Sequence, residues 1–421
     1  MQEPIMSMNK TKKPTETFKE PEILAPAGDF ECLQAAVRFK ADAVYLGMPE
    51  FGMRAAAKGF GHEHLPGAVE FAHRHNVKVY LTVNIIPRNS DIETLPALVK
   101  TAAASGVDAF IVADIGTAGI IKNLDPNISL HISTQAGVTN YAAANEFYKL
   151  GASRIILARE LTLDEIRQIR RSIPADLELE VFVHGAVCVS YAGRCLLSQY
   201  MTMRDANMGK CAQPCRWNYN LVEEKRPGEY FPVFEDEYGT SILSAADLCM
   251  LEHLDKLRDA GINGFKIEGR AKSMYYVSVI TNAYAMAKKY LPKRGGEFVL
   301  PEWISSEVYK VSNRNYGTGF FFDPGGSSVK AAENGYVRGY GFAAVVEGYR
   351  NNCLEVSQRG KFCRGDTLEV LVPGIEPYRI QAIEMYDRDF VSIESAPHAK
   401  MKVFIKYDKE LPKGSILRIR K

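Results

Sequence analysis

Short apolar stretches rich in β-branched residues alternate with amphipathic stretches through the first two thirds of the chain. The apolar stretches have the length of strands buried on both faces. They begin at Glu22, Ala43, Val77, Ala109, Ser129, Arg154, Leu179 and Gly264. Several intervening stretches carry apolar residues at three- and four-residue spacing, as helices packed on one side do. Eight such units predict a (β/α)8 TIM-like barrel at residues 21–291. A doubly wound open sheet is the alternative, because periodicity does not show closure.

The seventh predicted unit contains an insertion. About 55 residues separate the strand that ends near Cys188 from the next predicted helix, at 244–261, where about two to six residues are usual. We therefore expect an insertion at 189–243 on the face of the barrel where the carboxyl ends of the strands meet. Active sites of such barrels lie on that face.

The segments that flank the predicted barrel differ from it in amino-acid composition and in the spacing of their apolar residues. Residues 1–20 are polar, lysine-rich and interrupted by proline, which predicts a disordered tail. Residues 292–334 are rich in glycine and proline and predict a connector. Short alternating segments follow at 335–421, and they predict a small antiparallel β-barrel domain.

Composition is that of an ordinary globular protein. Of 421 residues, 52 are lysine or arginine and 50 are aspartate or glutamate, so no strong overall charge attracts nucleic acid and any such binding must depend on local patches. Residues 335–421 hold 15 basic and 11 acidic residues, which permits contact with RNA.

No apolar run approaches the roughly 18 residues that span a bilayer, and the start lacks a signal-peptide core. We expect a cytoplasmic protein with no membrane partner.

Four of the eight cysteines lie within 28 positions, namely Cys188, Cys195, Cys211 and Cys215. A chain with a core of ordinary size does not need a disulfide framework. Thiolates are ligands of zinc and of iron–sulfur clusters, and a loop folded back over its own first cysteine could bring four of them together. The cysteines therefore predict a metal site. From the residues alone, an iron–sulfur cluster, zinc and free structural thiols all stay open.

The eighth predicted strand carries charges at alternate positions. Lys266, Glu268 and Arg270 share one face, which points into the mouth or the interior of the barrel. Three charges there are costly unless they are paired or bind substrate. Lys272 follows at the start of the next helix. The segment is thus a candidate site, with a purely structural ion network as the alternative.

Polar residues at the ends of the other strands complete a candidate catalytic ring. They are Glu22, Asn84, Asp114, Gln135, Arg159, Glu160 and His184. We predict catalytic roles for His184, Lys266 and Glu268, although a buried core histidine is the commoner outcome for such a residue. The cations predicted to bind a dicarboxylate or a phosphate are Arg54, Arg159, Arg270 and Lys272.

The segment Glu178–Ser198, ELEVFVHGAVCVSYAGRCLLS, resembles the signature of the collagenase-like peptidase family U32. The positions that fit are Glu180, Phe182, Gly185, Ala186, Val187, Cys188, Gly193, Cys195, Leu197 and Ser198. The opening EILAPAGDFECLQAAVRFKADAVYLG and the stretch GFKIEGRAKSMYYV are similar to the same family. The resemblance therefore extends over nearly the whole chain, including the small C-terminal domain.

Within that family the chain looks like the tRNA hydroxylation proteins, which make 5-hydroxyuridine at the wobble position with prephenate and without molecular oxygen. Relatives hydroxylate ribosomal RNA or ubiquinone precursors, and the latter hold a four-iron cluster on four cysteines. The resemblance implies prephenate as co-substrate, the tRNA anticodon loop as partner, an unidentified electron donor, and a 4Fe-4S cluster. Its ligands would be Cys188, Cys195, Cys211 and Cys215. Two alternatives stay open: a peptidase, and a noncatalytic partner of a homologous hydroxylase subunit.

Overall fold

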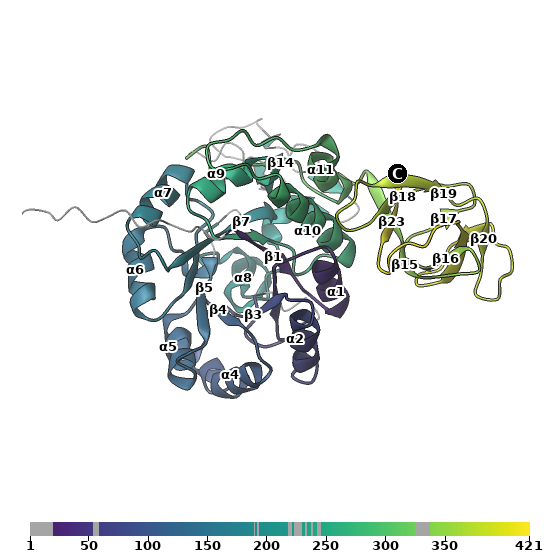
Figure 1. Ribbon diagram of the computed structural model, residues 1–421. Helices are drawn as coiled ribbons and strands as arrows, with labels where there is room; N and C mark the ends of the chain where they lie inside the picture. Colours follow the sequence, from purple (N-terminus) through teal and green to yellow (C-terminus); the bar gives the residue numbers. More distant parts are fainter. Residues whose placement is uncertain are drawn as a thin grey trace, which may run out of the picture.

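The computed structural model describes most of the chain as a barrel of strands and helices with a smaller β-domain beside it (Figure 1). The described residues are 20–53, 59–188, 190–191, 193–217, 221–222, 230–231, 234–236, 239–241, 246–324 and 337–421. Residues 1–19 of the predicted disordered tail and Arg54 lie outside the described residues.

Eight parallel strands in the described part of the chain form the barrel. They are β1 (Glu22–Pro26), β2 (Ala43–Gly47), β3 (Lys78–Val83), β4 (Ala109–Val112), β5 (Ser129–Ile132), β6 (Arg154–Ile156), β7 (Glu178–Gly185) and β13 (Gly264–Ile267). The first seven pair in chain order, and β13 pairs with both β7 and β1, which closes the sheet. The predicted TIM-like barrel is confirmed, and the open-sheet alternative is excluded.

Helices cover the outer face of this barrel (Figure 1). They are α1 (Phe30–Arg38), α2 (Leu65–His73), α3 (Asn89–Ile92), α4 (Leu95–Ala104), α5 (Ile115–Leu124), α6 (Tyr141–Lys149), α7 (Leu163–Arg171), α9 (Leu254–Asp259) and α10 (Met274–Lys289). Local sequence fixes several of their starts. Asp29 accepts a hydrogen bond from the Cys32 amide at α1, and Thr162 forms a capping box with Glu165 at α7, so amide groups that lack a helical partner are satisfied.

The helix predicted at 244–261 begins only at Leu254. The first part of that segment forms β12 (Asp247–Cys249), which runs antiparallel to β7, and β14 (Tyr316–Gly317) pairs with β12 in turn. The buried Asp247 carboxylate accepts hydrogen bonds from the Arg314 amide at 3.0 Å and from its Nη2 at 2.7 Å. Sequence-distant pairing therefore overrides the local helical pattern here.

The insertion after β7 contains one short helix and small strand pairs among its described residues. These are α8 (Leu197–Thr202), β8 (Leu221–Val222) paired with β9 (Tyr230–Phe231), and β10 (Phe234–Asp236) paired with β11 (Gly239–Ser241). The predicted connector carries α11 (Glu302–Ser305), a 3-10 turn at Ser306–Lys310, and β14. It therefore adds β14 to the edge of the barrel sheet through β12.

Residues 337–421, all of which the structure describes, form a seven-stranded antiparallel sheet that curls into a half-barrel (Figure 1). Its strands, in sheet order, are β19 (Tyr378–Gln381), β18 (Thr367–Leu371), β23 (Ile416–Arg420), β15 (Tyr340–Arg350), β16 (Cys353–Gln358), β22 (Lys402–Lys406) and β20 (Met385–Tyr386). A further pair is β17 (Phe362–Cys363) with β21 (Ser395–Ala396). The sheet encloses its own apolar core.

A buried ion-pair cluster joins this domain to the connector. Arg418 on β23 is fully buried and donates to Glu307 at 2.6 and 2.9 Å and to Glu369 at 2.8 Å. Lys310 lies 2.8 Å from Glu307 and 2.9 Å from Glu369. Two cations and two carboxylates thus neutralise one another where desolvated charges would otherwise be costly.

Candidate active site

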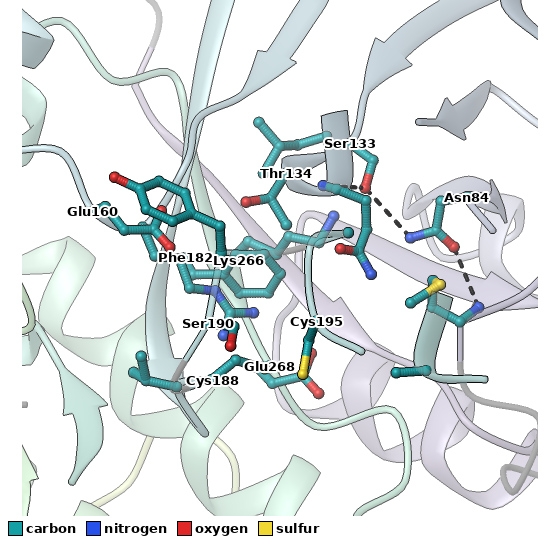
Figure 2. A pocket seen from close by; sticks show the side chains of 18 of the residues that line it. Asn84, Ser133, Thr134, Glu160, Phe182, Cys188, Ser190, Cys195, Lys266 and Glu268 are labelled. Carbon is teal, nitrogen blue, oxygen red and sulfur yellow. Dashed lines mark hydrogen bonds between the residues drawn. The ribbon is translucent and has the colours of Figure 1, made fainter. Parts of the chain in front are cut away.

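A cavity of about 370 Å³ opens at the carboxyl ends of the barrel strands. Its walls come from β2, β3, β6, β7, β13, the loops after several of these strands, and the insertion after β7 (Figure 2). The polar and charged lining residues from the strands and their loops are Thr82, Asn84, Ser133, Thr134, Gln135, Arg159, Glu160, Lys266, Glu268 and Arg270. The cavity lies on the face where the sequence predicts the site.

Lys266, Glu268 and Arg270 all line this cavity, but only Lys266 belongs to the eighth barrel strand, because β13 ends at Ile267 and the other two lie in the turn after it. Lys266 is 4% exposed, and its Nζ lies 3.2 Å from Glu180 Oε1 and 4.6 Å from the centre of the Tyr45 ring. Burial lowers the pKa of Lys266, and the Glu180 carboxylate opposes that shift. The Tyr45 hydroxyl lies 3.4 Å from Glu268 Oε2. A cation, a carboxylate and a phenol therefore meet at one wall of the cavity, where Figure 2 shows Lys266 and Glu268.

Arg270 crosses the mouth of the barrel to β3, where its Nη1 donates to Thr82 Oγ1. The guanidinium packs directly on Gly47, since a Cβ at that position would lie 2.2 Å from Nη1. Glycine at the end of β2 therefore leaves the room that the arginine fills.

Arg159 lines the same cavity and shares the Phe182 ring with Lys266, whose Nζ lies 5.5 Å from the ring centre. Its guanidinium lies 4.0 Å from the centre of the Phe182 ring, and Nη1 donates to the Ala186 carbonyl at 2.7 Å. Its Nε and the Oε1 of Gln135 are buried and have no hydrogen-bond partner within the part of the chain that the structure describes. Buried polar atoms are nearly always paired, so both atoms suit a polar ligand in the cavity.

Three of the four clustered cysteines, Cys188, Cys195 and Cys211, line the same cavity, and Cys215 lies four residues further on in a 3-10 turn. Figure 2 shows Cys188 and Cys195. Among the described residues, no three His, Cys, Asp or Glu side chains are gathered closely enough to hold a metal ion. The thiols fit an iron–sulfur cluster or zinc in chemistry and in location. Binding would have to draw them together.

His184 does not line the cavity. It belongs to β7 and is 1% exposed, with Nδ1 3.3 Å from the Tyr284 hydroxyl and Nε2 3.3 Å from the Tyr316 hydroxyl. Burial lowers its pKa to about 3. The predicted catalytic role of His184 therefore has no support from its position.

The other predicted site residues divide between the cavity and positions outside it. Asn84, Gln135, Arg159 and Glu160 line the cavity. Lys272 stands outside the lining, with its Nζ 5.4 Å from the centre of the Tyr276 ring. Glu22 binds Arg154 at the amino ends of the strands, and Asp114 caps α5.

The residues that sequence reasoning missed are mainly uncharged. Tyr45, Thr82 and Phe182 line the cavity from the strands, and Ser133 accepts a hydrogen bond from Asn84 at 3.4 Å. Phe182 lies two residues after Glu180, which binds Lys266 inside the barrel, and the alternation of side chains along a strand could have placed it inward.

A charged network fills the barrel next to the cavity. Arg154 lies 2.9 Å from Glu22, 2.5 Å from Glu178 and 2.9 Å from Glu180. Glu180 is fully buried and also binds Lys266. The Lys266 ammonium in the cavity is thus held by a carboxylate that is itself fixed from the other end of the barrel.

We expect His184→Gln to weaken the pH dependence of stability. In the unfolded chain histidine titrates near about 6.5, whereas the folded pKa is about 3. Between these values the unfolded state binds more protons, so stability falls as the pH falls. At about pH 5 the penalty is about 2 kcal/mol relative to neutral pH. Glutamine retains hydrogen-bonding groups but does not titrate. Urea unfolding of both proteins at about pH 7.5 and about pH 5 measures the difference, and identical pH dependence would contradict the expectation.

A closed parallel barrel with a charged, thiol-lined cavity at its carboxyl face defines a TIM-barrel enzyme. The sequence matches agree with this class. Residues 28–330 match the pattern of peptidase family U32, and residues 338–418 match that of the C-terminal domain of the family. The chain therefore belongs to peptidase family U32, which confirms the resemblance seen in the sequence.

Relatives of this chain bear names of two kinds. A tRNA hydroxylation protein of Bacillus subtilis is 34% identical over 404 residues, covering 95% of each chain. An uncharacterized protease of Methanocaldococcus jannaschii is 43% identical over 304 residues, covering 72% of this chain and 73% of its own. A 23S rRNA 5-hydroxycytidine synthase of Escherichia coli is 34% identical over 357 residues, covering 83% of this chain and 52% of its own.

The described helices include none with the length and hydropathy that a membrane span requires.

Proposed function

We propose that this protein hydroxylates the wobble uridine of tRNA to 5-hydroxyuridine in the cytoplasm. In this proposal prephenate is the co-substrate, molecular oxygen is not used, and the four clustered cysteines hold an iron–sulfur cluster. Replacing hydrogen by a hydroxyl group at carbon five is a two-electron oxidation, so a separate redox partner takes up the two electrons. Two relatives named for RNA hydroxylation support the proposal, because they act on different RNAs and each aligns with most of this chain.

The observation that carries the proposal is the meeting of cations and thiols in one cavity. Arg159, Lys266 and Arg270 line it together with Cys188 and two further cysteines. Arginine binds carboxylates through paired hydrogen bonds, so the three cations suit a dicarboxylate such as prephenate. A volume of about 370 Å³ lies within the usual range for small-ligand sites.

The aromatic part of the wall suits a flat ring. Phe182 and Tyr45 line the cavity beside the cations. A uridine flipped out of the anticodon loop could pack against such rings, as unpaired bases do in other RNA complexes. Glu268, near the Tyr45 hydroxyl, is placed to hold or accept a proton from a bound substrate. A cluster on the four cysteines would supply one-electron transfer.

The site gives less support to the hypothesis that the protein is a peptidase. A cysteine peptidase needs a thiol activated by a neighbouring base, usually histidine, and no histidine is found among the described residues that line the cavity. A noncatalytic partner of a homologous subunit is the other alternative. It predicts that the protein alone is inactive and that activity appears on mixing with the homologue.

Nucleoside mass spectrometry of bulk tRNA tests the proposal. A strain lacking the gene is expected to lose 5-hydroxyuridine and its derivatives, and the intact gene is expected to restore them. Deletion of any homologous gene in the same strain removes redundancy as an explanation. If the tRNA profile then stays unchanged while the purified protein cleaves peptides, the hydroxylase proposal is wrong and the peptidase alternative stands.

A further inference from the structure

The short helix α8, in the insertion, turns its apolar side to solvent. Leu196, at its N-terminal end, is 68% exposed, Tyr200 is 87% exposed, and Met203, at its C-terminal end, is 80% exposed. Leu196 immediately precedes α8 and Met203 immediately follows it with a left-handed backbone, so the three exposed side chains mark the two ends and the solvent side of the helix. We call this surface the α8 face.

The polar side of the same helix packs inward. Ser198 is buried, its hydroxyl donates to the Arg204 carbonyl at 2.6 Å, and it accepts from the Ala212 amide at 3.0 Å. Rotating the helix to bury Tyr200 would break these bonds. A surface helix normally buries its apolar stripe, so this reversed orientation indicates a surface that another molecule covers.

The surroundings of the α8 face are basic. The described side chains of residues 190–217 include three basic ones, Arg194, Arg204 and Lys210, and a single acidic one, Asp205. Asp205 lies 3.5 Å from Arg88 and accepts a hydrogen bond from the Asn207 amide at 2.8 Å. The face therefore suits a partner that combines apolar flat groups with negative charge. Single-stranded RNA has this combination, whereas a second copy of the chain would set like charges against one another.

The α8 face also adjoins the cavity. Tyr191 lines the cavity and is 51% exposed, and Cys195, which lines it as well, immediately precedes Leu196. We propose that the α8 face stacks the unpaired bases next to the nucleotide that enters the cavity, with Tyr200 as the main stacking residue. This inference rests on the proposed function, in which the substrate is RNA.

The test measures binding of an RNA hairpin carrying the anticodon loop to the full-length protein by fluorescence anisotropy. Tyr200→Ala combined with Met203→Ala is expected to weaken binding about tenfold for each stacked base that is lost. Tyr200→Phe keeps the ring and should bind like the wild type. Tyr141→Ala on α6, where the side chain is 51% exposed, is the matched control and should also bind normally.

A second readout locates the contact. Hairpins with 5-bromouridine beside the target nucleotide are expected to crosslink to the peptide that contains Tyr200. Normal RNA binding by the double variant, with no such crosslink, overturns the role of the α8 face while leaving the proposed function intact. If the wild type binds no RNA, both fail. A change in self-association by light scattering, or in vesicle binding, with unchanged RNA binding assigns the face to a second copy or to lipid and overturns the RNA assignment.

Discussion

Replacing any one of Cys188, Cys195, Cys211 or Cys215 by serine is expected to abolish RNA hydroxylation and the visible absorbance of the protein together. A serine hydroxyl does not replace thiolate as a cluster ligand at neutral pH, and three of these cysteines line the same cavity as the predicted catalytic Lys266. Anaerobic purification, iron and sulfide analysis, absorbance spectra and nucleoside mass spectrometry of tRNA measure the two losses.

Cys363→Ser provides the control, because Cys363 lies on β17 in the C-terminal domain. This variant should keep both colour and activity. Hydroxylation by a colourless cysteine variant would falsify a role for the cluster in the reaction. A colourless wild type that contains zinc and no iron would instead support the zinc alternative.

The barrel could be predicted because each of its strands is a short apolar run with its own boundaries. Glu22–Pro26 and Ala43–Gly47 are buried along nearly their whole length, so their sequences carry the signal of a strand covered on both sides. The closure of the strands into a barrel could not be predicted in the same way. It depends on the pairing of β13 with β7 and β1, and no local pattern encodes a contact between strands so far apart in the chain.

The segment at 244–261 shows where local pattern misleads. Its apolar spacing fits a helix, yet Asp247 is held in an extended strand by Arg314, a partner 67 residues further along the chain. The energy of that buried ion pair and of pairing with β7 exceeds the small preference of a few residues for helix. Such a competition cannot be judged without knowing the partner.

The site was predictable in part for the same reasons. Alternate spacing predicted that Lys266, Glu268 and Arg270 reach the same cavity, and they do, but strand geometry explains only Lys266, because β13 ends at Ile267 and the other two lie in the turn that follows. His184 shows the limit. It lies near the carboxyl end of β7, but Tyr284 on α10 and Tyr316 on β14 pack against its ring and enclose it. Whether a strand-end residue faces the cavity therefore depends on elements that pack there later in the chain.

Glu180→Ala is expected to cause a large loss of stability. Glu180 is fully buried, and it binds Arg154 at 2.9 Å and Lys266 at 3.2 Å. Arg154 keeps Glu22 and Glu178 as partners, but Lys266 loses the carboxylate that neutralises it. Breaking a buried ion pair from one side costs about 3–5 kcal/mol. Urea unfolding measures the change, with Glu146→Ala in the exposed pair with Lys149 as a control expected to cost less than about 1 kcal/mol.

Removing both members of the pair separates stability from chemistry. Glu180→Leu combined with Lys266→Met leaves no unpaired charge, so most of the lost stability should return, because apolar side chains can replace a buried ion pair at little cost. Hydroxylation should not return, since the cavity then lacks the Lys266 ammonium. A double variant that is both stable and active would show that Lys266 and Glu180 form a purely structural network, and the anion-binding role would then rest on Arg159 and Arg270 alone.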